Sequence, residues 1–118
     1  MSCGNPAVIL DFAGADGLRH TQVFREPVRV IAACSVDEVR HALREVEGAT
    51  RSGLYAVGYV AYEAAPAFDP AFAVREGCSV PLLWFGLFRE VSELSVPARP
   101  GACRITSWEP SISKSAYL

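Results

Sequence analysis

The sequence lacks a hydrophobic run long enough to cross a bilayer. Its longest apolar stretch, Pro81 to Phe88, is less than half of the roughly 20 residues that a transmembrane helix needs, and no basic segment followed by an apolar one opens the chain. Positive charge is also sparse: 11 Lys and Arg residues are scattered among 13 Asp and Glu residues, a formal net charge of −2. We therefore expect a cytoplasmic protein that binds neither membrane nor nucleic acid.

Cysteine pairs with ligand-like spacing are absent as well. The four cysteines are widely separated and no histidine stands near them at a metal-ligand spacing: Cys3, Cys34, Cys78 and Cys103. Neither a zinc site nor a disulfide framework fits that distribution in a reducing compartment, so we predict buried free thiols. A nucleophilic pair of Cys34 with His41 is disfavoured, because Cys34 precedes the helix predicted to hold His41.

What the sequence does contain is enough apolar material for one domain. The chain has 118 residues and a mass of 12.7 kDa, which excludes a two-domain enzyme with a cleft between its lobes. Hydrophobic residues make up 51% and charged residues 20%. This balance allows a sizeable core without disulfide or metal staples.

Short strands are predicted in the first third. Ala7 to Phe12 is an apolar, partly β-branched run, and Gly14 to Gly17 is a plain turn, since it lacks both the Lys and Ser/Thr of a phosphate loop and the glycine order of a dinucleotide-binding turn. Thr21 to Phe24 and Val28 to Ala33 form one bent strand or two strands, because Pro27 cannot donate a ladder hydrogen bond. An antiparallel meander fits this region.

One principal amphipathic helix is predicted over residues 36–52. Ser35 and Glu38 form a capping box, which places the start at Val36. Apolar residues then recur at helical spacing on one stripe: Val36, Val39, Leu43 and Val46. Arg51 suits the C-terminal end of the helix dipole, and Gly53 provides a left-handed stop.

Two further strands are predicted over Tyr55 to Tyr62 and Leu82 to Phe88. Both faces of each are apolar, so we expect two central strands covered on both sides. Glu90 to Gly101 is predicted to be a loop and Arg104 to Trp108 a last strand. The predicted fold class is α+β, with a mainly antiparallel sheet.

The last residues begin a helix that the sequence does not continue. The stretch from Pro110 to Leu118 has a serine cap followed by helix-compatible residues, and the sequence stops within the first or second turn. A helix that short is costly to nucleate. We therefore interpret Leu118 as a truncation point, with residues 1–110 as the domain and 111–118 as the start of a further region.

No catalytic, cofactor-binding or metal-binding residue is predicted. The acidic candidates have no spacing that pairs carboxylates on one element: Asp11, Asp16, Glu63 and Asp69. Glu63 follows an apolar strand, so it pairs with an arginine or another hydrogen-bond partner, or it contacts a ligand or a second domain. Five aromatic residues either pack in the core or line an apolar pocket: Tyr59, Tyr62, Trp84, Phe85 and Phe88.

Two segments carry a family resemblance. Residues 56–72 read Ala-Val-Gly-Tyr-Val-Ala-Tyr-Glu-Ala-Ala-Pro-Ala-Phe-Asp-Pro-Ala-Phe, and residues 81–88 read Pro-Leu-Leu-Trp-Phe-Gly-Leu-Phe. They resemble the N-terminal region of aminodeoxychorismate synthase component I, the folate-pathway relative of anthranilate synthase component I. The surrounding order is similar too, with Phe24 to Pro27 before a strand and Trp108-x-Pro110-Ser111 before a helix. The resemblance spans roughly residues 7–118.

The resemblance implies that this chain is the non-catalytic N-terminal domain of an enzyme with a larger, C-terminal chorismate-binding region. The complete enzyme would use Mg²⁺ and ammonia released from glutamine by an amidotransferase subunit, and would convert chorismate to 4-amino-4-deoxychorismate for 4-aminobenzoate and folate biosynthesis. The catalytic and metal-binding residues of such enzymes lie in the C-terminal region. We expect the chain alone to be inactive and to self-associate through an exposed apolar face.

Two alternatives remain open. Some relatives bind tryptophan through a Leu-Leu-Glu-Ser-like segment, where this sequence has Ile9-Leu10-Asp11-Phe12; Phe12 replaces the small hydroxyl residue, which favours the folate enzyme over anthranilate synthase. The chain could instead be the N-terminal domain of anthranilate synthase component I. A free-standing module that binds or senses a small molecule is the second alternative.

Overall fold

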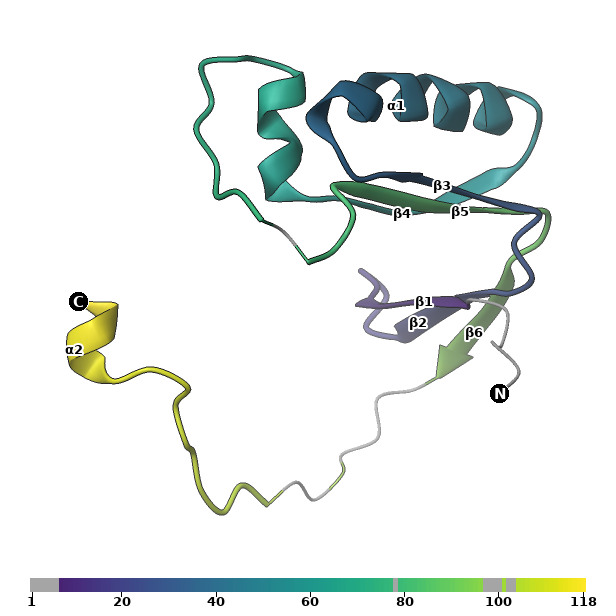
Figure 1. Cartoon of the computed structure of the whole chain (residues 1–118). Helices are drawn as coiled ribbons and strands as arrows, with labels where there is room; N and C mark the ends of the chain where they lie inside the picture. Colours follow the sequence, from purple (N-terminus) through teal and green to yellow (C-terminus); the bar gives the residue numbers. More distant parts are fainter. Residues whose placement is uncertain (1–6, 78, 97–100, 102–103) are drawn as a thin grey trace, which may run out of the picture.

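The computed structural model describes residues 7–77, 79–96, 101 and 104–118 (Figure 1). The elements follow one another as β1 (Val8–Ala13), β2 (Arg19–Phe24), β3 (Arg29–Ala33), α1 (Val36–Arg51), β4 (Tyr55–Val60), the 3₁₀ helix η1 (Tyr62–Ala67), β5 (Leu83–Phe88), β6 (Ser92–Val96) and α2 (Lys114–Tyr117). The fold is α+β, as predicted, with antiparallel strands, one principal helix and a short C-terminal one. Among the described residues, no helix combines the length and apolar character of a membrane span.

The strands form two separate three-stranded sheets, ordered β1-β2-β6 and β3-β5-β4. The predicted meander is therefore correct for β1 and β2 and wrong for β3, which leaves the first sheet and pairs with β5. The direction changes at Glu26, whose φ of 55° lies in the left-handed region. After Pro27, the Val28 N–H donates to the Leu87 carbonyl at 2.8 Å, which starts the new pairing.

The sequence prediction for the chain after β5 is wrong in two places. Ser92–Val96, predicted to be a loop, is strand β6 and pairs with β2. Arg104 to Trp108, predicted to be a strand, has no regular structure. Polar and apolar residues alternate over Glu93 to Val96, which is the strand period, but the prolines that follow in the sequence outweighed that signal in the prediction.

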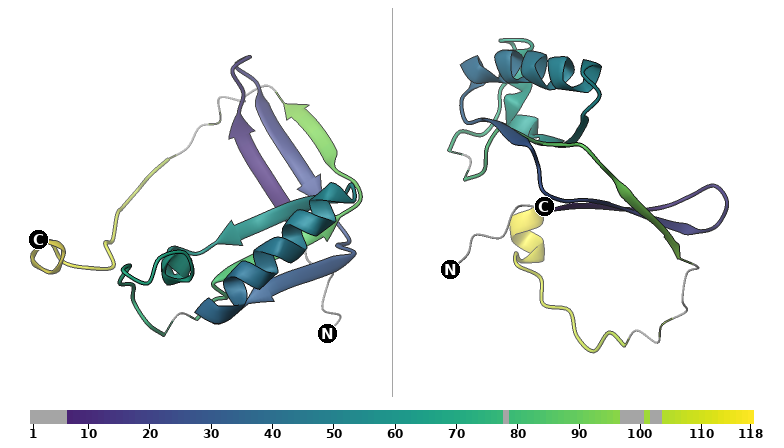
Figure 2. Two further views of the ribbon diagram at one scale, coloured as in Figure 1. Left: turned by 90° about the horizontal axis from the view of Figure 1, so that it is seen from above. Right: turned by 90° about the vertical axis from the view of Figure 1, so that its right-hand side faces the viewer.

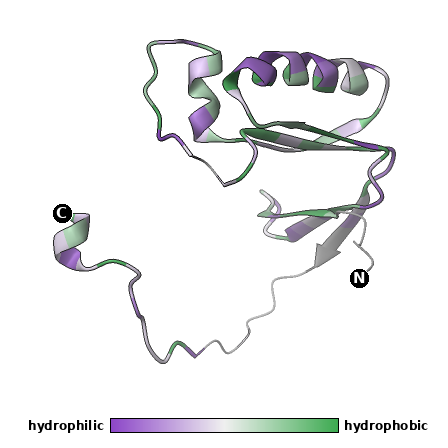
Figure 3. Cartoon of the chain, viewed as in Figure 1, coloured by the Kyte–Doolittle hydropathy of each residue, from purple (hydrophilic) through white to green (hydrophobic). Residues whose placement is uncertain are grey.

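Helix α1 forms as the sequence predicts. Glu38 Oε2 accepts from the backbone N–H groups of Ser35 at 3.1 Å and Cys34 at 2.9 Å, which is the Glu38 half of the capping box. Gly53, with φ of 98°, follows the last turn. Hydrophilic residues colour the outer side of the helix, and hydrophobic residues mark the strands beneath it (Figure 3).

The main core lies between α1 and one face of the β3-β5-β4 sheet, which the helix crosses (Figure 2). Its buried side chains come from these elements, η1 and the residue before β5: Ile31, Ala33, Val39, Ala42, Val46, Ala64, Leu82, Leu83 and Leu87. A second, smaller cluster joins the two sheets. It consists of Phe24 from β2, Val57 from β4 and Phe88 from β5, with Val8 and Val91 packed against it.

Strand β5 is central, as predicted, whereas β4 lies at the edge of its sheet. Strand β4 also ends at Val60, two residues earlier than predicted, because the chain turns into η1, where Pro66 cannot take part in a ladder. The prediction that both strands are covered on both sides is wrong. Helix α1 covers most of one face of the sheet, and the opposite face is partly open.

Candidate functional site

The face of the β3-β5-β4 sheet that points away from α1 carries large apolar side chains. In β5, Leu83 and Leu87 face the helix core, so the alternating residues Trp84, Gly86 and Phe88 lie on the other face. A Cβ at Gly86 would meet the rings of Phe88 at 2.6 Å and Trp84 at 3.3 Å, which shows that these rings share that face. Phe88 is buried there by Phe24, while Trp84 is only half-buried.

Neighbouring strands extend this apolar face. Tyr59 of β4 lies directly opposite Trp84, and Val30 of β3 lies opposite Gly86, and residues paired in this way share a face. Tyr59 is 40% exposed and Val30 is 41% exposed. Phe24 therefore shields Phe88 from solvent but leaves Tyr59 and Val30 on the same face of the sheet exposed.

The β1-β2-β6 sheet adds a second apolar stretch on the same side as the inter-sheet cluster. Val8 packs against that cluster, and Leu10 and Phe12 follow it at strand alternation. Both are substantially exposed, Leu10 by 40% and Phe12 by 46%. We call Leu10, Phe12, Val30, Tyr59 and Trp84 the open apolar face. Sequence reasoning missed its β1 and β3 members, although strand alternation in Val8–Ala13 carried the signal.

The predicted aromatic set therefore divides between core and surface. Phe88 is fully buried, and Phe85 packs against the main core. Tyr59 and Trp84 belong to the open apolar face. Tyr62 is 85% exposed at the start of η1. The five side chains do not line one pocket. The prediction of core packing is correct for two of them, Phe85 and Phe88.

Asp11 is held in a local polar network on the β1-β2 hairpin. Its two carboxylate oxygens accept from Arg19 Nε at 2.8 and 2.9 Å, and Thr21 Oγ1 donates to Oδ1 at 3.4 Å. The Arg19 hydrogen bonds hold the pKa of Asp11 below its ordinary value. The carboxylate is thus an exposed cross-strand partner.

Asp16 has a similar structural role in the hairpin turn. Its Oδ1 accepts from the Leu18 N–H at 3.0 Å, which lowers its pKa, and its Oδ2 lies 2.9 Å from His20 Nε2. The His20 ring stacks on Phe12 with centroids 5.6 Å apart, and its Nδ1 lies 3.5 Å from Glu93 Oε1. Gly14 to Gly17 is the plain turn that the sequence predicts, with φ of 76° at Gly17.

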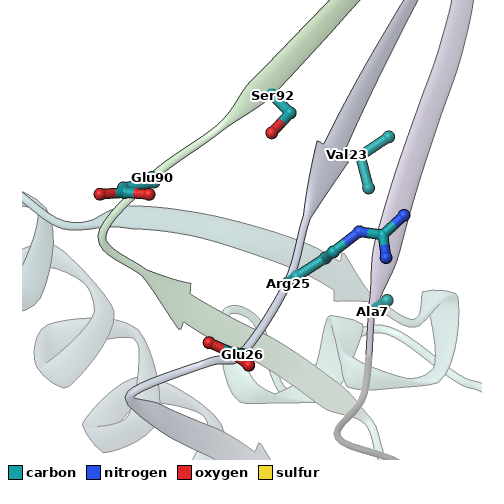
Figure 4. A pocket seen from close by; sticks show the side chains of 6 residues that line it. All are labelled: Ala7, Val23, Arg25, Glu26, Glu90 and Ser92. Atoms are coloured by element: carbon teal, nitrogen blue, oxygen red, sulfur yellow. The ribbon is translucent and has the colours of Figure 1, made fainter.

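A hollow of about 480 Å³ lies where the chain passes between the two sheets (Figure 4). Arg25, Glu26 and Glu90 carry the charges around it, with Ser92 and Val23 on the strands of the first sheet. All three charged residues are exposed, and in the described part of the chain no hydrogen bond or ion pair joins them. The sequence does not predict this group, because its charged members lie in two connections between the sheets, β2 to β3 and β5 to β6, which only the fold brings together.

Glu63 lies in the first turn of η1 and is half-buried. It lines a pocket of about 520 Å³ together with the start of α1 and the loop after η1. The predicted arginine or hydrogen-bond partner is not found among residues 7–77, 79–96, 101 and 104–118. Asp69 Oδ1, by contrast, accepts from the Ala71 N–H at 2.9 Å and stabilises a turn.

Cys34 is exposed, so the prediction of a buried thiol is wrong for this residue; it lies in the short connection between β3 and α1, ahead of the residues that α1 buries. His41 Nε2 lies 3.9 Å from Glu45 Oε2 on the exposed side of α1, and no hydrogen bond joins these two described residues, His41 and Cys34. The other cysteines, Cys3, Cys78 and Cys103, lie outside the described residues.

In the part of the chain that the structure describes, no three His, Cys, Asp or Glu side chains lie close enough together to hold a metal ion. The chain matches no family model, no curated protein and no solved structure.

Proposed function

We propose that this chain is a non-catalytic docking domain whose open apolar face packs against a further polypeptide region. The observation that carries the proposal is the exposure of Leu10, Phe12, Val30 and Tyr59 on the side of the two sheets that α1 does not cover. Exposed apolar side chains that lie together on one side of a protein often mark an interaction site. The three aromatic rings of this face, Phe12, Tyr59 and Trp84, would supply large contact area.

The polar groups support a structural role over a catalytic one. Asp11, Asp16 and Asp69 each hold a hairpin or a turn. General acid or base chemistry needs a carboxylate that can reach a substrate with a tuned proton affinity. These three are exposed and already engaged by their neighbours, so binding through the apolar face is the better-supported activity.

The family resemblance names the partner region. We propose that the chain is the N-terminal domain of an aminodeoxychorismate synthase component I, with residues 1–110 as the domain and 111–118 leading into the chorismate-binding region. That region would carry the chemistry, including the Mg²⁺ and the contact with ammonia from an amidotransferase subunit. The described residues of this chain offer no three-ligand group for the metal, so the proposal places no Mg²⁺ ligand here.

The choice of the folate enzyme over anthranilate synthase is supported by Phe12. The relatives that bind tryptophan carry a small hydroxyl residue at the matching position. Here the position holds a ring stacked on His20, and the neighbouring Asp11 carboxylate is engaged by Arg19. An indole ligand would find neither the hydroxyl nor a free carboxylate.

The proposal is tested by mixing the purified chain with a separately expressed chorismate-binding region of an aminodeoxychorismate synthase component I. Calorimetry and sedimentation velocity should show a complex, and Tyr59→Lys should weaken it. Val60→Lys is the matched control, because Val60 is equally exposed but alternates onto the other side of β4.

Activity provides an independent check. The chain alone, supplied with chorismate, ammonia and Mg²⁺, should form no aminodeoxychorismate. Turnover by the chain alone, or a complex that Tyr59→Lys and Val60→Lys affect equally, would overturn the proposal.

A further inference from the structure

We propose that the pocket beside η1 binds a small organic cation, an ammonium group attached to an apolar body. This site is separate from the open apolar face, and the inference does not depend on the docking role. The pocket lies between the start of α1, η1, the loop that follows η1 and the residue before β5. Its volume of about 520 Å³ is within the range of small-molecule sites, roughly 300–1,000 Å³.

Part of the pocket wall is apolar. Val36 comes from the first turn of α1, Leu82 stands just before β5, and Pro66 and Phe72 come from η1 and its loop. Leu82 is buried and its N–H donates to the Ala33 carbonyl at 2.8 Å, so this wall is fixed by the sheet. Such walls suit a hydrocarbon or aromatic body.

Glu63 provides the polar contact. It is half-buried in the pocket wall, and none of the described residues gives it a hydrogen bond or ion pair. A carboxylate that is partly removed from water loses part of its hydration, and here no described protein group replaces that stabilisation. A bound ammonium group would replace it through a charge-assisted hydrogen bond.

The remaining charges favour a cation over an anion. Arg75 and Glu76 also line the pocket and offset each other, which leaves the Glu63 charge in excess. Two further carboxylates lie in the first turn of α1: Glu38 is engaged by the N–H groups of Cys34 and Ser35, and Asp37 does not line the pocket. Phe72, which is 56% exposed, adds an aromatic face of the type that attracts ammonium groups.

The test titrates the full 118-residue chain with benzylamine as the probe. Binding is measured from the amide chemical shifts in two-dimensional NMR spectra. We expect saturable shifts confined to the pocket, at residues such as Val36, Ala73 and Gly77. Benzyl alcohol, which has the same ring without the charge, should bind at least about tenfold more weakly.

Variants separate the carboxylate from the fold. Glu63→Gln keeps the size of the side chain and removes the charge, so it should weaken benzylamine binding by at least about tenfold while the thermal midpoint stays unchanged. Glu47→Gln, on an exposed carboxylate of α1 paired with Arg51, is the matched control and should bind as the parent does. Phe72→Ala should weaken binding by about two- to fivefold.

Three results would overturn the proposal. The first is an absence of saturable shifts at the highest soluble probe concentration. The second is equal binding of benzylamine and benzyl alcohol, and the third is equal binding by Glu63→Gln and Glu47→Gln. Shifts that map to the open apolar face would likewise place the probe elsewhere.

Discussion

Phe24 and Phe88 pack against each other across the junction of the two sheets, with ring centroids 5.4 Å apart and ring planes inclined by 50°. Phe24 ends β2 in the first sheet, and Phe88 ends β5 in the second. Together with Val57 they form a cluster of three buried residues that is separate from the main core. The mutual orientation of the sheets, and with it the shape of the open apolar face, depends on this small contact.

Replacing Phe24 by alanine should therefore destabilise the protein strongly. Phe-to-Ala changes at buried positions cost about 3–5 kcal/mol through lost burial and the cavity left behind. The free energy of unfolding from urea denaturation, followed by circular dichroism, measures the effect. Phe72→Ala is the control, because Phe72 is 56% exposed and the loss of its ring should cost less than about 0.5 kcal/mol. Equal effects of the two changes would contradict this reading of the junction.

Two glycines should respond to alanine in opposite directions. A Cβ at Gly58 would lie 1.9 Å from the Trp84 carbonyl oxygen and 2.7 Å from the Phe85 Cα, and backbone atoms cannot rotate away. Gly58→Ala should cost at least about 2 kcal/mol. Gly48 lies within α1 with nothing near the added methyl group, so Gly48→Ala should stabilise by about 0.5–1 kcal/mol. Thermal midpoints of both variants, compared with the parent, test the pair; a stable Gly58→Ala protein would show that β4 and β5 can separate locally.

The sequence predicts α1 closely because the signals for a helix are local. The capping box at Ser35 and Glu38 places the first residue at Val36, and the observed end at Arg51 is one residue before the predicted one. Strand positions were also largely predicted. Of the strand pairings, the antiparallel pair β1-β2 was predicted, because a short turn joins its strands. The others were not, because they join residues far apart in the chain: β3 pairs with β5, and β2 with β6.

The candidate sites follow the same division. The continuous apolar run of β5 predicted that both of its faces are apolar. Only the fold shows that α1 covers one face and that Phe24 covers part of the other. Glu63 was singled out because a carboxylate followed an apolar run. Whether an arginine lay beside it depended on distant chain segments, which a single sequence does not place.

Acid should weaken the start of α1 through Glu38. Hydrogen bonds from the backbone N–H groups of Cys34 and then Ser35 hold the pKa of Glu38 below its ordinary value of 4.5. The folded state therefore binds a proton less readily than the unfolded state. The stabilisation is fully present above pH 4.5 and is lost as the pH falls through the lower folded-state pKa.

Glu38→Gln isolates this contribution, because glutamine keeps an acceptor oxygen and does not titrate. Urea denaturation of both proteins between pH 7 and acid should show the parent as the more stable one at neutral pH. The difference should shrink below the ordinary glutamate pKa of 4.5. A difference that stays constant over this range would show that the charge of Glu38 does not matter for the cap.

The uncovered face should make the isolated chain self-associate. Leu10, Phe12, Val30 and Tyr59 expose apolar surface that a second copy can remove from water in the absence of a partner region. Sedimentation velocity over a concentration series should show reversible association, and Tyr59→Lys should weaken it by at least about tenfold, because a charge then has to be desolvated in the contact.

Val60→Lys is a stringent control for that experiment. The two positions are adjacent in β4 and similarly exposed, Tyr59 by 40% and Val60 by 43%, but they lie on opposite faces of the strand. Added charge affects solubility equally at either position, so only contact through the open apolar face separates the two variants. If both lysines reduce association to the same extent, net charge is the cause; if the parent chain is monomeric at every concentration, the face is too small to hold a second copy.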